Sequence, residues 1–156
     1  VNAMGCVGTD ASESQLAIAF ATTHPGAWAA VGVHPHEAKN GVEGLEAFLK
    51  DERLRPKIVA ISEIGLDYFY SHSTRQQQAA ALESQVQLAL DVGLPIIFHV
   101  RDAFGDFWPI FSNFSSNSQK IRGVLHSFND SQKNVDKARA HNLLIGVNGI
   151  ATFTKD

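Results

Sequence analysis

The chain has 156 residues, 44% of them hydrophobic and 19% charged, which is enough for one globular domain with a substantial core. Its net charge of −3 excludes an overall positive field that attracts nucleic acid, so a phosphate-bearing partner would have to be bound locally. The single cysteine, Cys6, excludes an internal disulfide framework. The sequence contains neither a membrane-spanning apolar run nor a recognisable signal peptide, and we expect a cytoplasmic protein.

Short apolar runs predict the strands of a parallel sheet. Six such runs occur, at residues 2–8, 28–33, 57–65, 95–100, 121–128 and 143–149. Their apolar residues are continuous rather than alternating, which is typical of parallel strands that are covered on both faces.

Segments with helical periodicity separate these runs, at residues 12–24, 42–50, 74–92 and 131–142. We expect Ser73 to cap the third of these helices and Gly93 to end it. The aromatic-rich segment 102–114 is predicted to be only partly helical, because Gly105 and Pro109 disfavour a helix interior.

The alternation of strands and helices predicts an α/β fold, either an open doubly wound sheet or a (β/α) barrel. The sequence contains no GxGxxG or GxxxxGK[ST] loop, and this absence favours the barrel. A complete eight-stranded barrel usually needs about 250 residues. We therefore predict an incomplete (β/α)8 TIM barrel of about six βα units, in one domain over residues 1–156, with both ends looking cut.

A good metal ligand lies at or near the end of each of four consecutive predicted strands. These residues are His34, Glu63, His99 and His126, and Asp67 follows Glu63 closely. Because the carboxyl ends of parallel strands meet at one face, these side chains should converge. Imidazole nitrogen and carboxylate oxygen suit a divalent ion such as Zn, Mn or Mg, which can activate a water or polarise a phosphoryl oxygen. Each residue alone could have a structural role, but their equivalent positions favour a shared metal site.

Arg101 follows His99 by two residues and should lie at the same rim. It could bind a phosphate or carboxylate in a bidentate manner. It could equally form an ion pair with Asp67, Asp102 or Asp106, and both alternatives stay open. The remaining histidines do not end strands and are expected to be structural; they are His24, His36, His72 and His141.

Several of these segments together resemble the TatD family of metal-dependent hydrolases, members of the amidohydrolase superfamily that are often described as DNases. The matching segments are "VGTD" (7–10), "VGVHPHEA" (31–38), "AISEIGLDYFY" (60–70), "PIIFHVRDA" (95–103), "GVLHSF" (123–128) and "IGVNGIATF" (145–153). They occur in family order and cover nearly the whole chain.

The resemblance implies a barrel with one or two divalent metals at its C-terminal face and hydrolysis of DNA phosphodiesters, commonly as a 3′-to-5′ exonuclease. By position, Glu63 resembles the family's catalytic, metal-bridging carboxylate. His99 and His126 resemble the histidine ligands of the second metal. His34 and Arg101 resemble rim residues that contact the substrate phosphate.

The chain also departs from the family pattern. The family's first strand ends in an H-x-H pair and its last strand carries an aspartate base, and this chain contains neither, so it corresponds to family strands two to seven. We therefore expect weak hydrolysis or none from the chain alone, and self-association through exposed strand edges. Two alternatives remain: an amidohydrolase-type hydrolase of small esters, amides or lactones, and a non-catalytic fragment.

Overall fold

The computed structural model describes residues 2–115 and 121–153, and the strands in these ranges form one parallel sheet. The strands are β1 (Met4–Val7), β2 (Ala27–Val31), β3 (Ile58–Asp67), β4 (Ile96–Arg101), β5 (Gly123–Leu125) and β6 (Leu144–Ile145). They lie side by side in chain order, and every neighbouring pair is parallel.

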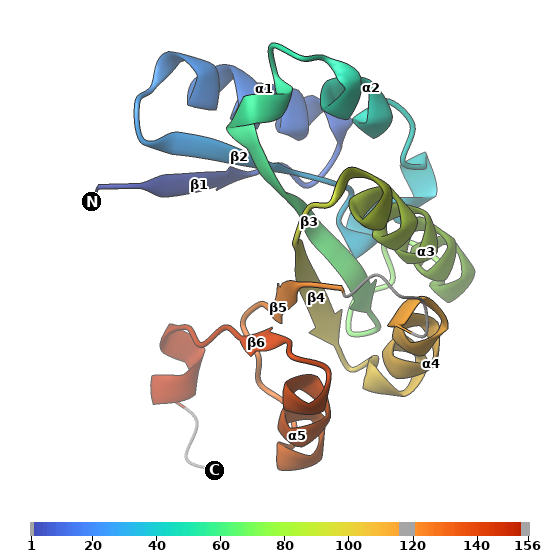
Figure 1. The fold of residues 1–156 in the computed structure, drawn as a ribbon. Coiled ribbons are helices and arrows are strands. Elements are labelled where there is room, and N and C mark those ends of the chain that lie inside the picture. The colour runs from blue at the N-terminus through green and yellow to red at the C-terminus, as the bar shows by residue number, and fades with distance from the viewer. Residues whose placement is uncertain (1, 116–120, 154–156) are drawn as a thin grey trace.

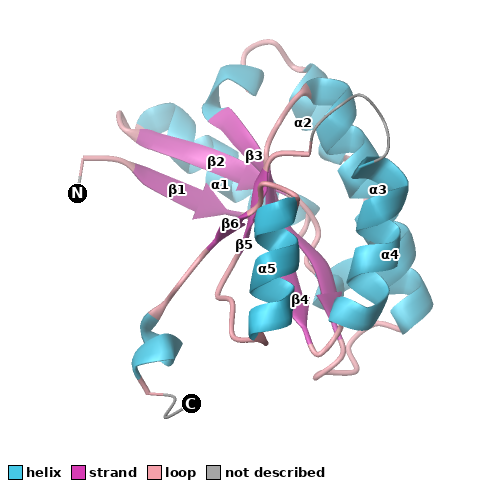
Figure 2. Cartoon of the chain, turned by 60° about the horizontal axis from the view of Figure 1, so that its bottom comes forward, coloured by secondary structure: helices cyan, strands magenta, loops and turns pink. Residues whose placement is uncertain are grey.

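Helices connect successive strands (Figure 2). The described helices are α1 (Ala11–Thr23), α2 (Leu45–Lys50), α3 (Arg75–Val92), α4 (Phe104–Ser115) and α5 (Gln132–Ala140), with 3-10 turns η1 (Pro35–Asn40), η2 (Arg55–Lys57) and η3 (Gly149–Thr152). The helices α1 to α5 follow the outer side of a curved sheet (Figure 1). A doubly wound sheet would reverse its strand order at a switch point, and this sheet does not. The predicted α/β fold, part of a (β/α) barrel wall, is confirmed.

Two predicted helix features were wrong in detail. The segment with Gly105 and Pro109 forms a regular helix, α4, because its aromatic residues are buried and tertiary packing overrides local propensity. The N-cap of α3 is Thr74 rather than Ser73: the Thr74 hydroxyl accepts from the Gln77 amide, and the Gln77 side chain accepts in return from the Thr74 amide.

The last two strands are shorter than their apolar runs predicted. Of residues 121–128, only Gly123–Leu125 pair as β5, and of residues 143–149, only Leu144–Ile145 pair as β6. Apolar composition therefore identified the position of each strand but not its length.

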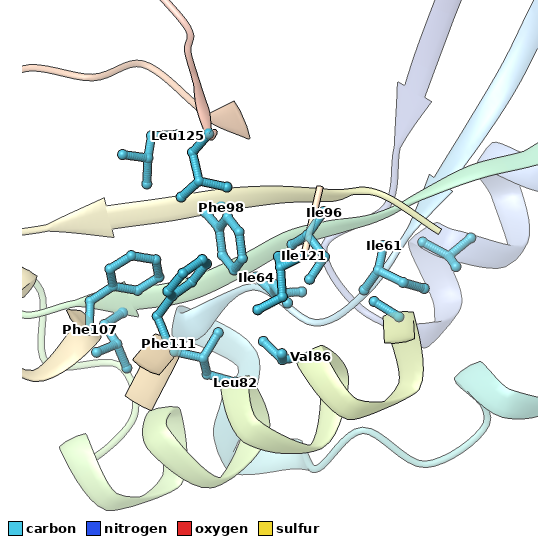
Figure 3. Packing of buried hydrophobic residues seen from close by; sticks show 14 of the residues in the cluster. Ile61, Ile64, Leu82, Val86, Ile96, Phe98, Phe107, Phe111, Ile121 and Leu125 are labelled. Carbon is cyan, nitrogen blue, oxygen red and sulfur yellow. The ribbon is translucent and has the colours of Figure 1, made fainter. Parts of the chain in front are cut away.

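The hydrophobic core lies between the sheet and the helices (Figure 3). Strand residues on the helix side pack against α3 and α4. Rings from the two layers touch, as in the edge-on contact of Phe98 with Phe107, whose ring centroids are 5.3 Å apart. Burial of each large side chain contributes about 1.5–3 kcal/mol. The completely or almost completely buried members include Ile61, Ile64, Leu66, Leu82, Ile96, Phe98, Phe107 and Leu125.

The opposite face of the sheet carries apolar side chains that are not covered. Trp28 is 36% exposed, Val59 is 41% exposed and Leu144 is 70% exposed. Fold stability in this chain therefore comes mainly from the helix-covered face. None of the described helices is long and apolar enough to cross a membrane.

Two buried glutamines of α3 hold the carboxyl ends of β2 and β3. The Gln85 side chain accepts from the Val33 amide (2.7 Å) and donates to the Val33 carbonyl (3.1 Å). The Gln78 side chain does the same at Asp67, with distances of 2.8 Å and 3.0 Å. Because the glutamines are two turns apart, both point from one face of the helix. They therefore fix the strand ends where the candidate site residues lie.

We predict that Gln78→Met destabilises the fold although it conserves side-chain size. The Asp67 amide and carbonyl would lose their buried partners, which should lower the free energy of unfolding by about 2–3 kcal/mol. Urea denaturation followed by circular dichroism measures this change. The matched control is Gln87→Met, since Gln87 is exposed on the same helix and should change the free energy of unfolding by less than about 0.5 kcal/mol. Equal losses in the two variants would contradict the role of Gln78.

Candidate metal centre

Glu63 projects from an irregular point in the sheet. The pairing of β3 with β4 shifts register between Ile61 and Ile64, and such bulges redirect side chains next to functional sites. Two residues later, Gly65 allows β3 to approach β4 closely, because a Cβ at this position would overlap the His99 carbonyl oxygen. The glycine therefore brings the strand that carries Glu63 against the strand that carries His99.

His99 lies between two carboxylates. Its Nδ1 is 3.5 Å from Glu63 Oε1, and its Nε2 is 2.8 Å from Asp67 Oδ2. Burial lowers the pKa of His99, but the hydrogen bonds to Glu63 and Asp67 outweigh burial and raise the pKa above its usual value. The pKa of Glu63 changes in the opposite direction: burial raises it, and the nearby His99 and His126 bring it below the usual value. The cluster thus favours an ionised Glu63.

Asp67 is 1% exposed and accepts hydrogen bonds at both oxygens. Its Oδ2 accepts from His99 (2.8 Å) and from His36 (3.0 Å), and its Oδ1 accepts from the amides of Phe69 (3.0 Å) and Tyr70 (3.2 Å). Burial raises the pKa of Asp67, but these hydrogen bonds dominate and lower it. A carboxylate with both oxygens occupied orients its neighbours rather than offering an open ligand position.

His34 begins η1, directly after β2, and its ring meets that of His99 edge-on at 4.6 Å. Its Nδ1 accepts a hydrogen bond from the His36 amide at 3.2 Å. Burial, and next the nearby His99 and His36, lower the pKa of His34 to about 4. The ring is therefore neutral at pH 7, and because Nδ1 accepts, the proton lies on Nε2.

The three predicted strand-end histidines lie around Glu63. His34, Glu63 and His99 each offer a ligand atom, and these atoms lie within 4.8 Å of one another. The His126 side chain is half exposed. Its Nε2 lies 3.6 Å from Glu63 Oε1 and 2.8 Å from the Ser127 hydroxyl. Imidazole and carboxylate atoms at this spacing can hold a divalent cation.

Arg101 makes no ion pair within the described residues. The structure therefore does not contain the expected alternative, an ion pair of Arg101 with Asp67, Asp102 or Asp106. Asp67 accepts from histidines and backbone amides, and Asp106 accepts instead from the Tyr68 hydroxyl at 2.8 Å. The Arg101 guanidinium lies over the Phe69 ring, 3.8 Å from its centroid. Its N–H groups are therefore not committed to a carboxylate.

His36 was expected to be only structural, yet its ring is part of this cluster. It donates to Asp67 and lies edge-on to His34, with ring centroids 4.4 Å apart. The sequence contained one signal for this, because His36 follows a strand-end histidine by two residues across a proline that starts η1. By contrast, a ring nitrogen of His24 contacts the Phe20 carbonyl at the end of α1 (2.9 Å), as predicted for a structural histidine.

Comparisons with known proteins give a consistent result. The family model described as "TatD related DNase" matches residues 1–156. The curated "3'-5' ssDNA/RNA exonuclease TatD" of Enterobacter lignolyticus is 34% identical over 150 residues, which cover 96% of this chain and 56% of that protein. The protein of the same name from Escherichia coli is 32% identical over the same shares. The chain thus spans just over half the length of the curated relatives it matches.

Solved structures of TatD proteins superpose on this chain. The crystal structure of YJJV, a TatD homologue from Escherichia coli, superposes with a TM-score of 0.85 at 27% identity, over 97% of this chain and 58% of that one. A TatD family hydrolase from Entamoeba histolytica shares the fold, with a TM-score of 0.77 at 24% identity, over 94% of this chain and 52% of that one. Since the family model matches the whole chain and the strand-end segments lie where that fold requires them, this chain belongs to the TatD related DNase family.

Proposed function

We propose that this chain provides part of the active site of a metal-dependent hydrolase that cleaves DNA phosphodiester bonds, as a 3′-to-5′ exonuclease. Glu63, His99 and His126 would hold the ion, and Glu63 would be the catalytic carboxylate. Names of the curated relatives support this activity, which they attach to ssDNA and RNA. The observation that carries the proposal is the proximity of both histidines to one oxygen of Glu63.

Each of the two histidines lies near one Glu63 oxygen at about the separation of two ligands of one ion, whereas the group whose ligand atoms all lie within 4.8 Å of one another contains His34 in place of His126. Two ligands that each lie about 2.1 Å from a tetrahedral ion are about 3.4 Å apart. Glu63 Oε1 lies 3.5 Å from His99 Nδ1 and 3.6 Å from His126 Nε2, so both histidines are at this separation from one carboxylate oxygen. Zn, Mn and Mg all remain candidates, with the two imidazoles favouring Zn or Mn over Mg.

The hydrogen bonds of the histidines favour the required tautomers. Asp67 accepts from His99 Nε2 and would keep a proton on that nitrogen, so Nδ1, on the side of Glu63, would present its lone pair to a bound ion once its own proton is lost. At His126, the Asn148 amide donates to the Ser127 hydroxyl, which is then able to donate to Nε2. A nitrogen that accepts from a hydroxyl presents a lone pair, and a rotation of that hydroxyl makes the lone pair available to a cation.

His34 and Arg101 suit the substrate phosphate better than the metal. The neutral His34 carries its proton on Nε2, so that atom is a donor rather than a ligand. Arg101 adds a fixed positive charge with uncommitted N–H groups. A bound ion would polarise the phosphoryl oxygen and lower the pKa of an attacking water. His34 and Arg101 would orient the phosphate and stabilise its negative charge.

Two further features stay predictions. A cytoplasmic location rests on the sequence, with its single cysteine. Self-association would use the edge strands β1 and β6, next to the exposed apolar face that includes Trp28, Val59 and Leu144.

Metal content tests the proposed ligand set. We expect the wild-type chain, dialysed after incubation with Zn or Mn, to retain about one ion per chain by plasma mass spectrometry. Glu63→Gln should retain far less metal, because a neutral amide is a poor replacement for the anionic ligand that lies between the two histidines. Glu83→Gln, at an exposed position on α3, is the control and should bind as the wild type does. A wild-type chain without bound ion would refute the proposed centre.

Asp67→Asn tests whether the buried carboxylate orients His99. The amide can accept one hydrogen bond in place of the carboxylate but does not stabilise the His99 tautomer as an anion does, so metal affinity should fall about 10- to 100-fold. Competition with a chelating dye measures this affinity. Asp106→Asn, which replaces an exposed carboxylate beside Tyr68, should leave it unchanged. Unaltered affinity in Asp67→Asn would show that His99 needs no such partner.

Hydrolysis of single-stranded oligonucleotides tests the activity itself. We expect the chain to shorten a 5′-labelled strand only slowly from its 3′ end, with loss of this weak activity in EDTA and recovery on addition of the metal. Arg101→Ala should reduce kcat/KM about 10- to 100-fold, because a charged contact to the substrate phosphate would be lost. Hydrolysis of small esters or lactones without nucleotide release would instead favour a different amidohydrolase-type activity, and no hydrolysis of either class would favour a non-catalytic chain.

A further inference from the structure

We propose that Phe69, with Tyr70 and Arg101, forms a subsite for an unpaired nucleobase beside the candidate metal centre. This inference rests on the proposed function and deepens it, because it states which part of the substrate is recognised: a base free of a partner strand. Three observations carry it, namely the position of the aromatic rings, their exposure and the way in which Arg101 lies against them.

The rings lie immediately beyond the strand ends that carry the centre. Asp67 is the Cα partner of Arg101 across β3 and β4, and Phe69 follows Asp67 by two residues. Arg101 follows His99 by two residues in β4, so both side chains leave the same face of the sheet. Tyr70 meets the His36 ring edge-on at 5.3 Å, and His36 is hydrogen bonded to Asp67. A nucleotide with its phosphate at the centre would therefore have its sugar and base next to these rings.

Both rings remain accessible although the backbone that bears them is fixed. Phe69 is 54% exposed and Tyr70 is 44% exposed. Their amides donate to the buried Oδ1 of Asp67, at 3.0 Å and 3.2 Å. Exposed aromatic faces on an ordered backbone are suited to base stacking, and because every base has a π-face, such stacking is tolerant of sequence.

Arg101 supplies the complementary charge. Its guanidinium carbon lies 3.8 Å from the centroid of Phe69 and 5.3 Å from that of Tyr70. Stacking uses the flat face of the guanidinium, which leaves the N–H groups in its plane able to donate to phosphate oxygens. The same side chain can thus bind a phosphate, while Phe69 would bind the adjoining base on the face of the ring opposite Arg101.

Space for more of the strand continues from Tyr70. A groove of about 510 Å³ is lined by Tyr70 and His72 and by the cationic Lys39 and Arg75. Basic side chains beside an aromatic platform are the combination that holds single strands by backbone and base together. A base inside a duplex is stacked on both faces, and a terminal base exposes one face only together with its paired partner, so an unpaired base fits against Phe69 most readily. The subsite therefore favours single-stranded ends.

The test compares base-bearing and abasic strands of equal charge. The probes are a fluorescent oligothymidylate and an abasic oligomer of the same length, both with phosphorothioate linkages that slow hydrolysis, and binding is followed by fluorescence anisotropy with the metal present. We expect the wild-type chain to bind the base-bearing strand about tenfold more tightly than the abasic strand. Phe69→Ala should reduce this preference to less than about twofold, and Phe69→Trp should retain it.

Two controls distinguish loss of the subsite from a general loss of aromatic surface or of structure. Phe20→Ala removes another exposed ring, which stacks on His24 in α1 away from the strand ends, and should keep the tenfold preference. Phe69→Ala should keep the wild-type metal content, which a collapsed site would lose.

Equal affinity of the wild type for both strands, or an unchanged preference in Phe69→Ala, would overturn the subsite. If metal-dependent shortening of DNA persists in that case, the proposed function stands and the subsite alone fails; if shortening and metal binding are both absent, the proposed function fails as well.

Discussion

The candidate centre depends on the carboxylate of Asp67. This single buried group accepts from His99 and His36 at one oxygen and from the backbone of Phe69 and Tyr70 at the other. A buried carboxylate is stable only when its oxygens accept hydrogen bonds. The four donors therefore stabilise the anion, and the hydrogen bonds hold the donor groups in position. The position of the His99 imidazole and the conformation of the rim loop therefore have one common cause.

The fold supports this interaction from the helix side. Gln78 of α3 holds the backbone of Asp67, and Gln85, two turns further along the helix, holds the backbone of Val33, just before His34. Around these polar contacts the same helix buries Leu82 and Val86 in the core. Hydrophobic packing thus fixes the helix, and the helix in turn fixes the strand ends. The site is rigid because its supports are part of the core.

The sheet has two different faces, and only one of them is stabilised by helices. The outer face is packed, whereas residues of the inner face such as Val59 and Leu144 are exposed. In a barrel, side chains from facing strands fill this interior in layers. The candidate site residues lie at the carboxyl ends of the strands rather than in the interior, so their arrangement depends on the helix side and on the contacts between adjacent strands.

The sequence by itself determined the fold class, the place of each strand and the four strand-end residues around the candidate centre, because continuous apolar runs, helical periodicity and position at a strand end are local properties. It did not determine that α4 would be a regular helix despite Pro109, that β6 would be two residues long, or that His36 would belong to the site. Nor did it decide whether Arg101 forms an ion pair with an aspartate or stays available to a phosphate, and it did not indicate that the guanidinium lies over Phe69. Those outcomes depend on contacts between segments far apart in the chain. Burial against other elements outweighs local propensity, and only the packed structure shows that Asp67 is occupied by histidines while Arg101 rests on Phe69.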